Sequence, residues 1–133
     1  MSRENVEIVR RSLDAYSRRD LDAYRSLHDP DLEFDWSASL GPEAGVYRGI
    51  DAVMRLHASY FETFVEIIIE PECFIEAGES VLVPNGSRST GRDGIEVYTR
   101  DVAFLFTVRD GRITHFRLYN DRGEALKAVG LED

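Results

Sequence analysis

The chain has 133 residues, enough for one domain with a hydrophobic core. Its formal net charge of -9 argues against binding to polyanions, which requires clustered Lys and Arg, so we expect neither nucleic acid nor an anionic membrane as a partner. The single cysteine, Cys73, excludes an internal disulfide and a cysteine-cluster zinc site. A polar beginning and the lack of a long apolar run lead us to expect a cytoplasmic protein.

The first half of the chain predicts helices and a short strand. An apolar stripe at three- and four-residue spacing indicates an amphipathic helix over residues 3–18. Asp20 is placed to cap a shorter helix that runs to about His28. Apolar and acidic residues alternate over 32–36, which predicts a half-buried strand, and a third helix is expected over 50–64.

The second half predicts mostly sheet. Strands are expected over residues 65–77, 79–90, 95–108 and 112–120. Glycine turns between them favour antiparallel hairpins, and Pro71 should lie at the sheet edge because proline cannot donate to a ladder. A last helix should begin at Asp121 and end near Gly130. The pattern predicts one α+β domain over residues 1–133.

The hairpin at Arg109-Asp110-Gly111 predicts two different sheet faces. We expect a type I turn followed by a glycine bulge. The face that can wall a pocket carries Val102, Phe104, Phe106, Phe116, Leu118 and Asn120. The opposite face mixes polar and apolar side chains, and it predicts a homodimer interface formed by Leu105, His115, Arg117 and Tyr119.

Two short motifs, taken with the order of elements, point to a known family. Gly45-Val46-Tyr47-Arg48-Gly49 opens a helix, and Arg109-Asp110-Gly111-Arg112-Ile113 joins two long strands. The chain in this respect resembles the SnoaL-like branch of the nuclear transport factor 2-like superfamily. The resemblance implies a cone, in which a curved antiparallel sheet wraps around the N-terminal helices and leaves an apolar cavity. Relatives include ketosteroid isomerases, polyketide cyclases, epoxide hydrolases, dehydratases and proteins with no known catalysis, so the fold alone does not settle function.

Two known catalytic sets are incomplete in this sequence. The positions that match the base, tyrosine and second acid of ketosteroid isomerases hold Trp36, Ser12, and Val102 or Phe104. A shift of one residue would bring Asp35 to the base position, so Asp35 remains a candidate. Limonene-type epoxide hydrolases need a water-activating acid where this chain has Leu118. SnoaL-type cyclases need an acid/base at the end of the last strand, where Asn120 and Asp121 lie, and a helix cap already explains Asp121.

His28 and His57 are the main candidates for acid/base catalysis. The resemblance places them where ketosteroid isomerases keep tyrosines that support the pocket, and histidine can exchange a proton near neutral pH. The alternative is that both are hydrogen-bonded core residues. Because neither has a ligand-like spacing to other residues, we expect no metal. No glycine-rich loop follows a strand with the spacing of a phosphate or dinucleotide site, so we expect no cofactor.

Strand alternation and aromatic spacing give the candidate ligand contacts. They are Trp36, Tyr60, Arg88, Tyr98, Arg100, Phe104, Leu118 and Asn120. Arg88, Tyr98 and Arg100 are assigned to the inner face because the latter two share parity with Val102. The alternative is that the arginines are solvated at strand ends and the aromatic residues are ordinary core.

Three functions therefore stay open. The first is a cofactor-independent isomerase or cyclase that acts on an apolar carbonyl compound through a histidine. The second is a non-catalytic protein that binds a small hydrophobic molecule. The third is a dimeric interaction module whose cavity is filled by side chains. The volume of the cavity separates the third from the others.

Overall fold

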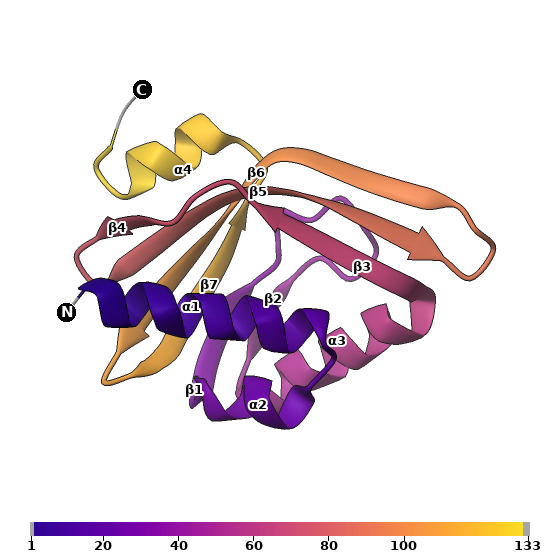
Figure 1. Cartoon of the computed structure of the whole chain (residues 1–133), viewed down its shortest axis with the longest axis horizontal. Helices are drawn as coiled ribbons and strands as arrows, with labels where there is room; N and C mark the ends of the chain where they lie inside the picture. The colour runs from indigo at the N-terminus through magenta and orange to yellow at the C-terminus, as the bar shows by residue number, and fades with distance from the viewer. Residues whose placement is uncertain (1, 132–133) are drawn as a thin grey trace.

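The computed structural model describes residues 2–131 (Figure 1). The elements follow the order α1 (Ser2–Ser17), α2 (Leu21–Ser26), β1 (His28–Asp35), β2 (Val46–Arg48), α3 (Ile50–Thr63), β3 (Phe64–Pro71), β4 (Ile75–Ala77), β5 (Ser80–Gly91), β6 (Glu96–Arg109), β7 (Arg112–Tyr119) and α4 (Arg122–Ala128). This α+β architecture, with its curved open sheet, confirms the predicted fold class. Within the described residues, no helix is long and apolar enough to cross a membrane.

The strands form one sheet in the order β2-β1-β7-β6-β5-β3, with β4 paired to β5. One pairing differs from the expected antiparallel sheet, because β1 runs parallel to β7. Parallel neighbours need a long connection, and here the whole chain between β1 and β7 supplies it. Pro71 ends β3, which lies at one edge of the sheet as predicted.

The helices divide between the two sides of the sheet. Figure 1 shows α1, α2 and α3 against the concave side and α4 on the opposite side. In β5, Val81 and Val83 join the main core, whereas Leu82 between them packs against Ala125 and Leu126 of α4. Because successive side chains of β5 point to opposite faces of the sheet, this strand contributes to the packing on both sides.

The helix α4 covers part of the face that was predicted to form a dimer. Leu105 and Tyr119 pack at the edge of the cluster beneath α4. His115 and Arg117, by contrast, are exposed. The predicted interface through this face stays a prediction, restricted to the area that α4 leaves open.

The predicted helix caps at Asp20 and Asp121 are confirmed, whereas one helix end, one turn and one strand differ from the prediction. Asp20 accepts from Ala23 N–H and Asp121 from Glu124 N–H, as helix caps do. The second helix ends before His28, which opens β1 instead. At the β6–β7 hairpin, Asp110 and Gly111 both have positive φ, 50° and 78°, so the turn is type I′ rather than the expected type I with a bulge. The predicted strand over 65–77 is divided into β3 and β4.

Candidate functional site

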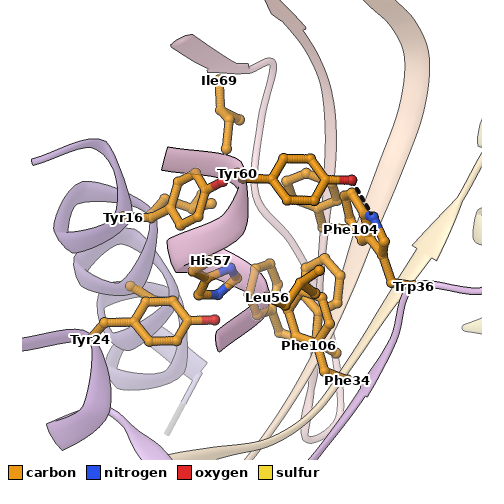
Figure 2. Close-up of a pocket in the computed structure, with 13 residues that line it drawn as sticks. Tyr16, Tyr24, Phe34, Trp36, Leu56, His57, Tyr60, Ile69, Phe104 and Phe106 are labelled. Atoms are coloured by element: carbon orange, nitrogen blue, oxygen red, sulfur yellow. Dashed lines mark hydrogen bonds between the residues drawn. The ribbon is translucent and has the colours of Figure 1, made fainter. Parts of the chain in front are cut away.

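A cavity of about 70 Å³ lies between the helices and the concave side of the sheet (Figure 2). Its walls come from α1, α2, α3, β1, β3, β6 and β7, and from the residue after β1. The lining residues are Ser12, Leu13, Tyr16, Tyr24, Phe34, Trp36, Leu56, His57, Tyr60, Ile69, Phe104, Phe106 and Phe116. Among these, none carries a carboxylate, an ammonium or a guanidinium group. The site is therefore an aromatic pocket with a few uncharged polar groups.

A second hollow adjoins this cavity. It is a groove of about 260 Å³ lined by Glu43, Tyr47, Ala52, Arg55, Leu56 and Ser59. Leu56 borders both spaces. The apolar interior and the more polar groove thus share this one side chain as part of their walls.

His57 is the most unusual residue of the cavity. It comes from α3 and is 5% exposed. Its ring lies nearly perpendicular to those of Tyr16, Tyr24 and Phe34, at centroid distances of 4.9, 4.7 and 5.5 Å. Its Nε2 has no hydrogen-bond partner among the described residues. Burial, with a contribution from nearby His28, lowers the pKa of His57 to about 3. The imidazole is therefore uncharged at neutral pH.

Tyrosine hydroxyl groups supply the other polar atoms. Figure 2 shows the Tyr16 and Tyr24 hydroxyls directed into the pocket. Burial raises the pKa of both phenols, with smaller effects from neighbouring tyrosines, so they stay protonated. Tyr60 Oη accepts a hydrogen bond from Trp36 Nε1 at 2.9 Å, which leaves the Tyr60 proton free to donate. The pocket thus presents hydrogen-bond donors but no base of ordinary strength.

His28 lies behind the cavity wall rather than in it. Its ring stacks on Tyr24 at a centroid distance of 4.0 Å. Its Nδ1 donates to the Tyr24 carbonyl at 2.7 Å, because a carbonyl can only accept, and Nε2 can then accept from Ser12 Oγ at 3.4 Å. Burial lowers its pKa to about 4, although the bond to Tyr24 opposes this. Both ring nitrogens are occupied, which matches the alternative of a hydrogen-bonded core residue.

Asp35, the third catalytic candidate, lies outside the cavity. It caps the turn after β1 by accepting from the Ser37 N–H at 3.0 Å and hydroxyl at 2.5 Å, and it lies 3.7 Å from Arg117 Nε. Burial raises the pKa of Asp35, but the Ser37 bonds and the Arg117 charge outweigh burial and hold the pKa below its usual value. The neighbouring residue Trp36 takes the inward position instead.

Arg88, Tyr98 and Arg100 also lie outside the cavity, on the face opposite to the expected one. The ladder of β5 and β6 shifts between the pairs Asn85–Val102 and Ser87–Thr99. The extra residue in β6 reverses which side chains face inward, and Asp101 adopts a φ of 57° there. Tyr98 therefore no longer shares a face with Val102. Arg88 instead pairs with Glu66 at 3.5 Å and Glu96 at 3.0 Å.

Of the remaining predicted ligand contacts, three line the cavity and two lie outside it. Trp36, Tyr60 and Phe104 line the cavity as expected. Leu118 is buried in the same core without lining the space. Asn120 is exposed and donates to the Ala38 carbonyl. It therefore fixes the loop after β1.

Several lining residues were absent from the predicted contact set, most clearly Tyr16 and Tyr24. Both belong to helices whose apolar stripes the sequence assigned to the interior. The sequence could have indicated these two tyrosines as cavity residues, because the hydroxyl group of a tyrosine on a buried stripe needs either a hydrogen-bond partner or an open space. No group of three His, Cys, Asp or Glu side chains is suited to a metal ion in the part of the chain described.

Comparison with known proteins agrees with this geometry. The family model of the SnoaL-like domain matches residues 9–116. A nuclear transport factor 2-like protein of unknown function from Burkholderia pseudomallei is 26% identical, covers 98% of this chain and 99% of its own, and superposes with a TM-score of 0.76. A nuclear transport factor 2-like protein from Burkholderia xenovorans is 28% identical over 97% of each chain, also with a TM-score of 0.76.

A proposed polyketide cyclase from Sinorhizobium meliloti is 26% identical, covers 84% of this chain and 93% of its own, and has a TM-score of 0.65. No curated protein matches the chain. The family model alone spans most of the sequence. The chain belongs to the SnoaL-like domain family of the nuclear transport factor 2-like superfamily.

Proposed function

We propose that this protein binds a small, largely apolar molecule that carries a carbonyl or hydroxyl group. The observation that carries the proposal is His57, a buried imidazole in an aromatic cavity with one ring nitrogen lacking a partner. A buried polar atom without a hydrogen bond costs roughly 1–3 kcal/mol. A ligand that supplies the missing bond recovers part of this cost, which makes the site selective for a polar group within an apolar body.

The volume of the cavity limits the size of the ligand that can enter it. The cavity of about 70 Å³ exceeds what a single water molecule needs, which argues against an interior filled by side chains. It is smaller than the roughly 300–1,000 Å³ of sites for drug-sized molecules. A larger ligand would have to displace the half-buried Trp36 and Tyr60 or extend past Leu56 into the groove. We therefore favour a single ring or a short branched chain.

Catalysis of isomerisation or cyclisation is the second candidate. The tyrosine hydroxyls and neutral His57 can donate hydrogen bonds to a carbonyl oxygen, which stabilises negative charge that develops there. The likeness to a proposed polyketide cyclase supports this reading. A base with a pKa of about 3 abstracts a proton weakly, so His57 would act mainly as a donor in such a reaction. For this reason binding is our first proposal.

Calorimetry with a matched pair of probes tests the binding proposal. Acetophenone and ethylbenzene share a ring and a two-carbon substituent, but only acetophenone has a carbonyl. We expect acetophenone to bind roughly fivefold more tightly, as one net hydrogen bond predicts. His57→Phe should remove this preference and keep the affinity for ethylbenzene. Equal affinity of the wild-type protein for both probes would contradict the proposal.

A further inference from the structure

A serine hydroxyl and a histidine ring meet at the wall of the cavity. Ser12 belongs to α1, lines the cavity and is 2% exposed. Its Oγ lies 3.4 Å from Nε2 of His28, which opens β1 and is 3% exposed. Binding of a carbonyl compound at His57 leaves this Ser12–His28 pair without a role, although it combines a hydroxyl with a titratable group.

The tautomer of His28 makes the serine hydroxyl the donor of this contact. Nδ1 of His28 lies 2.7 Å from the Tyr24 carbonyl oxygen, which can only accept, so the ring proton is on Nδ1. Nε2 therefore carries a lone pair, and Ser12 O–H donates to it. Burial lowers the pKa of His28 to about 4, so this lone pair stays unprotonated at neutral pH. Stacking on Tyr24, at a centroid distance of 4.0 Å, keeps the ring in place.

This arrangement has the parts of an activated nucleophile. A serine hydroxyl attacks a carbonyl carbon effectively when a neighbouring base takes its proton and a third group orients that base. Here Ser12 supplies the hydroxyl, His28 supplies the base, and the Tyr24 carbonyl orients the imidazole. General-base contacts as long as 3.4 Å tighten when the substrate binds. The pair is therefore suited to nucleophilic attack inside the cavity.

Donors for a developing oxyanion lie in the same cavity. Tyr16 follows Ser12 by one turn of α1, so the two side chains lie on one face of that helix. Figure 2 shows the hydroxyls of Tyr16 and Tyr24 directed into the pocket, and burial keeps both phenols protonated. Such protons stabilise the negative charge that forms on a carbonyl oxygen during attack.

We propose that Ser12 is the nucleophile of an acyl-transfer reaction on small aryl esters, with His28 as its general base. The proposal rests on the proposed binding of an apolar carbonyl compound, because the ester enters the same cavity. Ser12 Oγ bonds to the ester carbonyl carbon, and its proton passes to His28 Nε2. The bond from that carbon to the phenolic oxygen then breaks, and the phenol leaves with the proton. Water repeats both steps on the acyl-serine, which releases the carboxylic acid and restores the hydroxyl.

The lining of the cavity and the strength of the base select this class of ester. The walls are largely aromatic and carry no charged side chain, which favours a neutral ester with a ring. The cavity volume of about 70 Å³ restricts the acyl group to a short chain. A phenol departs more readily than an aliphatic alcohol or an amine, so it suits a base that burial has weakened.

Release of phenol from phenyl acetate by the full chain tests the reaction. Ser12→Ala removes the nucleophile, and His28→Gln keeps an acceptor for the Ser12 hydroxyl but removes the base. Each variant should lower the rate above solution background by roughly 100-fold or more, the usual contribution of a general base. The matched control Ser26→Ala changes an exposed helix serine whose Oγ donates to the Ala23 carbonyl, and it should keep the wild-type rate.

A covalent probe supplies a measurement that needs no variant. Phenylmethanesulfonyl fluoride should form a sulfur–oxygen bond to Ser12 with loss of fluoride, and peptide mass spectrometry should locate the label there. Acetophenone binding separates this proposal from the binding proposal, because Ser12→Ala should still bind acetophenone while it loses esterase activity. A wild-type protein that binds acetophenone but acquires no label at Ser12 would overturn the acyl-transfer proposal alone. So would phenyl acetate hydrolysis that persists at the wild-type rate in His28→Gln.

Discussion

The two buried histidines should make the free energy of unfolding fall as the pH drops below neutrality. Burial lowers the pKa of His57 from 6.5 to about 3 and that of His28 from 6.5 to about 4. The unfolded chain takes up a proton on each imidazole near pH 6.5, whereas the folded chain does not. Stability that is present above that pH is therefore lost as the pH falls toward the folded pKa values.

The size of the effect follows from these pKa values. At about pH 5, each histidine accounts for roughly 2 kcal/mol of lost stability, because the unfolded imidazole is almost fully protonated and the folded one is not. The two together give about 4 kcal/mol, a large share of the stability of a small domain. Acidic residues contribute an opposing trend, since the net charge of -9 is reduced in acid.

A single variant isolates the contribution of His57. His57→Phe removes the titrating group but keeps every acidic residue, and it breaks no hydrogen bond of the Nε2 atom. Urea unfolding followed by circular dichroism at about pH 7 and pH 5 should show about 2 kcal/mol less acid sensitivity than the wild type. His57→Leu serves as a second variant in case the phenyl ring overpacks the site. An unchanged pH dependence in both variants would refute the reasoning.

Three further predictions concern local structure. Tyr60→Phe removes the bond to Trp36, the chain's single tryptophan, and should shift its fluorescence while lowering stability by about 1 kcal/mol in urea unfolding. Asp121→Ala should cost about 1 kcal/mol through the lost cap of α4, measured by thermal unfolding. Gly86→Ala would place Cβ 2.8 Å from the Thr99 carbonyl oxygen, so hydrogen exchange in the hairpin should accelerate.

The elements and fold class followed from the sequence because periodicity and capping are local. The stripe of α1, the caps at Asp20 and Asp121, and the edge position of Pro71 all depend on near neighbours in the chain. The parallel pairing of β1 with β7 joins segments at opposite ends of the sequence. No local pattern encodes that pairing.

The predicted ligand contacts on β6 differ from the structure where a bulge changes the alternation of inward and outward side chains. Simple alternation along β6 would place Tyr98 on the same face of the sheet as Val102. The bulge at Asp101 adds one residue between them, so Tyr98 lies on the opposite face. A non-glycine residue with positive φ is uncommon, so the sequence contained little warning. Tyr98 and Arg100 consequently lie on the outer surface. Arg88 lies there for another reason, because on β5 it alternates in phase with Leu82, which packs against α4. Trp36, Tyr60 and Phe104 do line the cavity, because the bulge leaves their positions unaffected: Phe104 lies in the part of β6 that pairs with β7, and the other two lie on other segments.

The histidines show a different limit. His57 was a candidate because it lies on the apolar stripe of α3, and the structure places it in the cavity. His28 had equal standing in the sequence, yet its two ring nitrogens are occupied by Tyr24 and Ser12. Which histidine has a partner depends on tertiary contacts such as that between Ser12 of α1 and His28 at the start of β1, and sequence spacing does not reveal them.

The ¹⁵N spectrum of His57, recorded across pH with and without acetophenone, tests the central claim most directly. The imidazole should stay neutral between about pH 5 and 8, and its ring resonances should shift with acetophenone more than with ethylbenzene. An ordinary titration near pH 6.5, or resonances that respond equally to both probes, would contradict the account.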